Sequence, residues 1–125
     1  MMQLNLHSTS DHLAVRAFHG DSVTIGSETY THSILFSPEG PVTPWSASDV
    51  ASLGEEHIAQ LMEGKPEVVI LGSGDRLKFP PPRLIARFHG NQIGFEVMAN
   101  DAACRTYNVL ASEGRDVRAA LILTD

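Results

Sequence analysis

The apolar residues of the C-terminal half gather in short runs separated by amphipathic segments. Val68 to Leu71 form a continuous apolar run, which is typical of a strand buried on both faces of a parallel or mixed sheet. The pattern that follows predicts strands and helices in alternation, at residues 67–71 (strand), 82–89 (helix), 93–98 (strand), 100–113 (helix, capped by Asn100 or Asp101) and 117–123 (strand). Because the connections are short, residues 66–123 predict a βαβαβ core with right-handed crossovers.

The N-terminal half has a different pattern, with short β-rich pieces between tight turns. It predicts antiparallel strands at 14–18, 23–25 and 30–36, and a loop at 37–44. A helical segment is expected to begin at Ser48 or Asp49 and to run to about residue 63, and Gly54 can divide it. The fold class expected is α/β: a single domain over residues 1–125, with a mixed central sheet, flanking helices and an extra N-terminal antiparallel β layer. Residues 1–10 are polar and are expected to be flexible, with Leu4 and Leu6 as candidates to join a sheet edge.

Composition narrows the classes of function. The chain has 125 residues, 42% of them hydrophobic, and a formal net charge of -6 from 9 basic and 15 acidic residues. This balance argues against a domain built mainly to bind nucleic acid or an anionic membrane. It leaves room for a local basic patch, whose candidates are Arg76, Lys78, Arg83 and Arg87. No apolar run is long enough to cross a bilayer, and residues 1–10 lack the pattern of a signal or transit peptide, so we expect a cytoplasmic protein with no membrane insertion.

The loop Gly72-Ser73-Gly74 is the first candidate site. It follows a predicted buried strand, and ligands of open α/β sheets bind beyond the carboxyl ends of the strands, where backbone N–H groups can face a small anion. The surrounding sequence matches neither a dinucleotide-binding glycine motif nor a phosphate-binding P-loop, because Asp75, Arg76 and Leu77 follow. A structural turn is therefore the favoured interpretation, and a ligand cradle is the alternative.

Cys104 is the second candidate. Its predicted place near a helix N-terminus, next to Arg105, would lower the pKa of the thiol, whereas Asp101 opposes that effect. A single cysteine on a helix is more often a small packed residue. The six histidines are scattered without metal-binding spacing, so we expect no metal and no cofactor.

Several sequence pieces, in this order, resemble one family of small domains catalogued as a domain of unknown function (number 498). The pieces are Pro66–Gly74 (PEVVILGSG), Phe79–Pro82 (FPPP), Gly94–Met98 (GFEVM), Ala103–Leu110 (ACRTYNVL) and Glu113–Arg115 (EGR). That family includes the mitochondrial assembly factor 3 of respiratory complex I and an adipogenesis-associated vertebrate protein. The resemblance implies a compact α/β domain and, for the mitochondrial members, action through protein contacts. A chain without a targeting segment departs from those members and is expected to be of bacterial type.

Two main hypotheses follow. The first is a binding or assembly module with a protein partner, and its surface is expected at two neighbouring strand ends, formed by Gly72, Ser73, Gly74, Asp75, Asn100, Cys104 and Arg105. The second is a small-molecule enzyme in the same crevice, with Cys104 as nucleophile or redox thiol and the loop amides holding an anion. The sequence holds no complete catalytic constellation. A homo-oligomer formed through exposed strand edges is a weaker third hypothesis.

Overall fold

The computed structural model describes residues 12–123. The expected flexibility of residues 1–10, and the edge pairing of Leu4 and Leu6, lie outside the described residues. The elements are, in chain order, β1 (Val15–Phe18), β2 (Val23–Ile25), β3 (Glu28–Tyr30), β4 (Ile34–Phe36), β5 (Thr43–Pro44), η1 (Val50–Ser52), α2 (Glu55–Met62), β6 (Val68–Gly72), α3 (Pro82–Gly90), β7 (Gly94–Met98), α4 (Asn100–Ser112) and β8 (Val117–Leu121).

Two sheets organise the chain. A five-stranded sheet has the order β5-β4-β8-β6-β7, and a three-stranded sheet has the order β1-β2-β3. Strand β6 pairs in parallel with β7 on one side and with β8 on the other, whereas β4 pairs antiparallel with β8 and β5. The expectation of a mixed central sheet with an additional antiparallel β layer is confirmed. Every residue of the interior strand β6 is buried, as its continuous apolar run predicts.

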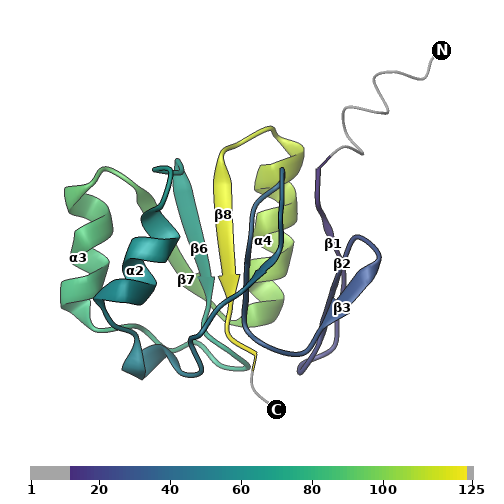
Figure 1. The fold of residues 1–125 in the computed structure, drawn as a ribbon, viewed down its shortest axis with the longest axis horizontal. Helices are drawn as coiled ribbons and strands as arrows, with labels where there is room; N and C mark the ends of the chain where they lie inside the picture. The colour runs from purple at the N-terminus through teal and green to yellow at the C-terminus, as the bar shows by residue number, and fades with distance from the viewer. Residues whose placement is uncertain (1–11, 124–125) are drawn as a thin grey trace.

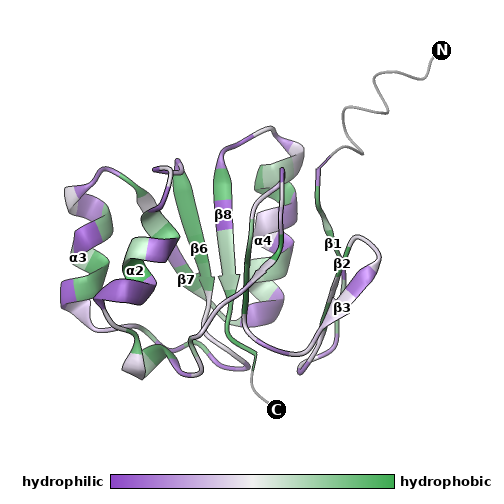
Figure 2. Cartoon of the chain, viewed as in Figure 1, coloured by the Kyte–Doolittle hydropathy of each residue, from purple (hydrophilic) through white to green (hydrophobic). Residues whose placement is uncertain are grey.

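The central sheet has a hydrophobic core on each face. Helices α2 and α3 lie together on one face, and α4 and the three-stranded sheet lie on the other (Figure 1). The first core includes Ile58 and Leu84 from the two helices, and the second includes Tyr107 from α4 together with Val23 from β2. Figure 2 shows β6 as an apolar strand between helices that carry both polar and apolar residues. Helices on both faces explain why β6 has no polar position.

The predicted strand 30–36 is wrong in one respect, because the structure divides it. Its first residue ends β3 in the small sheet, and Ile34–Phe36 form β4 in the large sheet. Between them, the buried hydroxyl of Ser33 accepts a hydrogen bond from the N–H of Leu123 at 3.0 Å. The chain changes sheets at this point, and a change of pairing partner leaves little trace in the local hydrophobic pattern.

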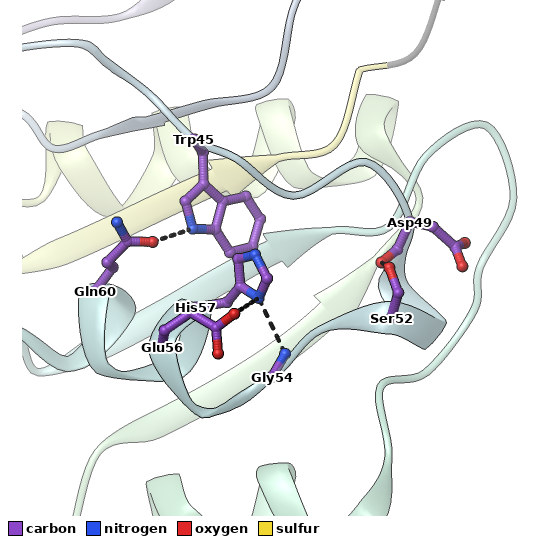
Figure 3. Close-up of polar contacts among 7 residues, drawn as sticks. All are labelled: Trp45, Asp49, Ser52, Gly54, Glu56, His57 and Gln60. Atoms are coloured by element: carbon purple, nitrogen blue, oxygen red, sulfur yellow. Dashed lines mark hydrogen bonds and ion pairs between the residues drawn. The ribbon is translucent and has the colours of Figure 1, made fainter.

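The predicted helical segment from Ser48 or Asp49 to about residue 63 is divided at Gly54, as expected, into η1 and α2 (Figure 3). Asp49 precedes the short helix η1 without a side-chain cap, and Gly54 precedes α2. The N–H of Gly54 donates to Nδ1 of His57 at 3.0 Å, which satisfies one backbone donor at the start of the helix. The indole of Trp45 packs edge-on against the His57 ring and donates to Gln60 Oε1 at 3.0 Å. These contacts fix the position of the segment that leads into the candidate site.

Candidate functional site

The carboxyl ends of β6, β7 and β8 are joined by one buried side chain, that of Asn100. Its Oδ1 accepts a hydrogen bond from the N–H of Gly74 at 3.2 Å, and its Nδ2 donates to the carbonyl oxygen of Ile122 at 2.9 Å. The backbone N–H of Asn100 also donates to the Gly74 carbonyl at 2.8 Å. The predicted meeting of the two strand ends is therefore seen. The prediction that Asn100 or Asp101 caps α4 is wrong, because the N-cap position belongs to Ala99. The Asn100 side chain instead holds neighbouring strand ends together.

Gly72 is required for this arrangement by close approach. A Cβ atom at this position would overlap with Asn100 Oδ1 and would lie 2.7 Å from Leu121 Cδ2. The Gly72 carbonyl accepts from the N–H of Ile122 at 3.1 Å, so its backbone remains in the sheet. The contacts of Gly72 favour the interpretation as a structural position over that as an anion holder.

Ser73 holds the loop that follows. Its buried hydroxyl donates to the Arg76 carbonyl at 2.7 Å and accepts from the N–H of Lys78 at 3.1 Å. The same hydroxyl lies 3.2 Å from the carbonyl oxygen of Met98. These contacts use its hydrogen-bonding capacity within the protein, and they give residues 73–78 a defined shape.

A pocket of about 330 Å³ opens at this end of the sheet. It is lined by Ser48, Asp49, Ser73, Gly74, Asp75, Arg76, Lys78 and Ile122. Asp75, a predicted site residue, therefore lines a real hollow. The lining also includes Ser48 and Asp49, which sequence reasoning treated only as helix caps. The pocket holds two carboxylates and two cations, so its charge is mixed rather than that of a simple anion cradle.

A second hollow, of about 760 Å³, lies near the beginning of β8, away from the predicted site residues. Its cations already have partners in the protein. Arg115 donates to Glu67 Oε2 at 2.9 and 2.6 Å, and this pair lowers the pKa of the Glu67 carboxyl. Arg118 donates to the carbonyl oxygens of Gln60 and Leu61, each at 3.2 Å. These arginines support the structure, so the hollow is a weaker candidate.

Cys104 faces the core and not the pocket. It is 5% exposed and belongs to the same cluster as Tyr107. Burial raises the pKa of its thiol to about 12, and the charge of Asp101 adds to the rise, while Arg105 opposes it. The structure agrees with the favoured interpretation of a small packed residue, and the alternative of a thiol with a lowered pKa is not supported, because desolvation outweighs the effect of the helix N-terminus.

Arg105 is also outside the pocket lining. Its guanidinium is exposed and lies 3.8 Å from the Asp101 carboxylate, one helical turn away. Such exposed pairs contribute only a few tenths of a kcal/mol. The structure thus groups Gly72, Ser73, Gly74 and Asn100 at one point, and it places Cys104 and Arg105 elsewhere on α4.

The loop between β6 and α3 carries a feature that the predicted site missed. Leu77 is 54% exposed and Phe79 is 62% exposed, although large apolar side chains elsewhere in the described residues are mostly buried. They alternate with the exposed Arg76 and Lys78. We call residues 76–83 the basic–apolar segment. The signal available in the sequence was its basic character together with two large apolar residues in a loop.

The two sheets and the helices on both faces of the larger one define a mixed α/β protein, and the comparisons with known proteins agree with this fold. The chain belongs to the family described as "Protein of unknown function (DUF498/DUF598)", whose model matches residues 15–122.

Three similar proteins accompany the family match. It is 31% identical over 74 residues to the "13 kDa major membrane protein" of Francisella tularensis, a match that covers 59% of this chain and 60% of that protein. It is 32% identical over 83 residues to NADH dehydrogenase (ubiquinone) 1 alpha subcomplex assembly factor 3 of Bos taurus, which covers 65% of this chain and 45% of that protein. The matches thus span about half the length of these relatives. A crystal structure of a Bordetella parapertussis protein superimposes with a TM-score of 0.84 at 33% identity, covering 91% of this chain and 97% of that one.

The name of the Francisella relative raises the question of membrane spans. None of the helices formed by residues 12–123 combines the length and the apolar character needed to traverse a bilayer.

Proposed function

We propose that this chain is a protein-binding module that assists the assembly of a larger complex, and that the basic–apolar segment is its contact surface. The observation that carries the proposal is the exposure of Leu77 and Phe79 on one loop. Large apolar side chains that are exposed on one part of the surface are a feature of protein-interaction sites. The name of the Bos taurus relative supports assembly as the kind of process, and a respiratory-type complex as its setting.

The polar groups nearby favour this proposal over the enzyme alternative. The side chains of Ser73 and Asn100 form their hydrogen bonds with backbone groups of the protein, and Cys104 is buried with a raised thiol pKa. A catalytic site needs groups that face the substrate within hydrogen-bond reach. The charged residues that line the pocket, among them Asp75 and Lys78, suit recognition of a partner better than catalysis.

The test is native mass spectrometry of the untagged protein, enriched gently from the soluble and membrane fractions of its own host. We propose a cytoplasmic location, so we expect the protein in the soluble fraction with a protein partner attached. The Leu77→Ser/Phe79→Ser double variant should lose that partner mass. Val109→Ser is the matched control, because Val109 is 54% exposed on α4 and should leave the partner bound.

Two results would overturn the proposal. One is a partner that stays bound to the double variant as firmly as to the unchanged chain. The other is a retained small molecule, with no protein partner, that is lost on substituting Arg76 or Lys78. That second result would make the pocket a ligand site.

A further inference from the structure

We infer that the partner presents an acidic stretch with at least one apolar side chain to the basic–apolar segment. This inference rests on the proposed function and adds the chemistry of the partner. It starts from the distribution of charge along the chain. Three of the nine basic residues lie within residues 76–83, Arg87 follows one helical turn later, and none of the fifteen acidic residues lies within residues 76–87. The segment is therefore a local basic region on a chain of net charge -6.

The cations of the segment are available to a partner. Arg76, Lys78 and Arg83 are exposed, and none of them forms an ion pair with another residue in the range 12–123. Arg87 differs, because it is paired with Glu55 on α2. Three unpaired cations beside two apolar side chains match a surface that offers carboxylates and an apolar group.

The segment is also held in place before any partner arrives. Ser73 fixes the loop at the Arg76 carbonyl and the Lys78 N–H. At its other end Pro80 is buried, and Pro82 begins α3. A loop with little freedom left to lose binds at a lower entropic cost, so this anchoring favours recognition of a defined partner.

The contact belongs on the segment and not in the pocket beside it. Asp49 and Asp75 line that pocket together with Arg76 and Lys78, so an incoming carboxylate would meet repulsion there. Leu77, Phe79 and Arg83 are absent from the pocket lining and are exposed. Residues 76–83 themselves contain no acidic residue, so the segment outside the pocket adds no carboxylate of its own to the contact.

An anionic membrane would also attract a surface that is both basic and apolar, but the number of unpaired basic residues favours a protein partner. Lipid-binding basic clusters usually hold about four to eight Lys or Arg residues. Here only Arg76, Lys78 and Arg83 are unpaired among the described residues of the segment, and the chain as a whole is acidic. Its net charge would be repelled by an anionic surface.

The experiment selects random dodecapeptides from a phage-displayed library on the intact chain. We expect the enriched peptides to carry net negative charge and at least one Leu, Phe or Trp residue. The affinity of the Arg83→Glu variant for a synthetic copy of the most enriched peptide should be about tenfold lower than that of the unchanged chain. The reason is that a like charge replaces an attractive one at the contact. Arg83 lies in the first turn of α3, where an acidic residue favours the helix, so the variant should fold. Arg16→Glu, at an exposed position of β1, is the matched control and should bind normally.

Enrichment of neutral or basic peptides, equal binding to Arg83→Glu, or no enrichment at all would overturn the inference. The inference would also be overturned if no acidic peptide is selected and the protein instead floats with phosphatidylglycerol vesicles in a manner that requires Arg83. These failures are distinct from failure of the proposed function. If native mass spectrometry still shows a partner that depends on Leu77 and Phe79, the module binds protein but not through acidic chemistry.

Discussion

Replacing Asn100 by alanine is expected to lower the free energy of unfolding by about 3 kcal/mol, as measured by urea denaturation followed by circular dichroism. The reason is that its buried side chain makes two hydrogen bonds, a partly buried one to Gly74 and a buried one to Ile122. Alanine would leave a backbone N–H and a carbonyl without these partners. Each buried polar group left unsatisfied costs roughly 1–3 kcal/mol.

Two further variants sharpen this prediction. Asn91→Ala replaces an exposed asparagine whose side chain donates to the Arg87 carbonyl at 2.7 Å, and it should cost no more than about 1 kcal/mol. Gly72→Ala should be costly in the unchanged chain but less so in the Asn100→Ala background, because one of the two side-chain atoms that the new methyl group would strike, Asn100 Oδ1, is then absent. Strict additivity of the two substitutions, or a negligible cost for Asn100→Ala, would contradict the view that these residues form one structural joint.

Alkylation of Cys104 by iodoacetamide is expected to be on the order of a thousandfold slower in the folded protein than in the unfolded chain at the same pH. Burial raises the pKa of this thiol to about 12, so the reactive thiolate is almost unpopulated near neutral pH. The rate is measured by intact mass spectrometry under conditions where the protein remains folded.

The unfolded chain in urea supplies the reference rate for that reaction. The folded rate should rise only at strongly alkaline pH, provided that circular dichroism shows the fold intact there. Rapid modification of the folded protein at neutral pH would contradict the assignment of Cys104 as a packed core residue. It would also restore the enzyme hypothesis in its covalent form.

The C-terminal half of the fold is readable from the sequence because its signals are strong and local. A continuous apolar run at 68–71 specifies a strand covered on both faces, and Pro82 begins α3 where the sequence places it. The shared edge of the parallel strands then follows from topology, and with it the meeting of Gly74 and Asn100. Each of these steps depends on a short stretch of chain.

The parts that sequence reasoning missed depend on long-range packing. The rotation of α4 about its axis decides whether Cys104 or Arg105 faces solvent, and a boundary error of one residue turns a helix by about 100 degrees. Ser48 and Asp49 reach the pocket from a segment far from the loop in sequence. The exposure of Phe79 was likewise undetermined, because an apolar residue in a loop is as readily buried as exposed.

Site-specific photocross-linking at position 79 tests the central proposal most directly. A photoreactive phenylalanine analogue replaces Phe79 in the host cell, and the same analogue replaces Val109 on α4 as the control. The proposal predicts one discrete protein adduct from position 79 and none of that mass from position 109. No adduct at position 79, or the same adducts from both positions, would show that the basic–apolar segment is not the surface through which this protein binds its partner.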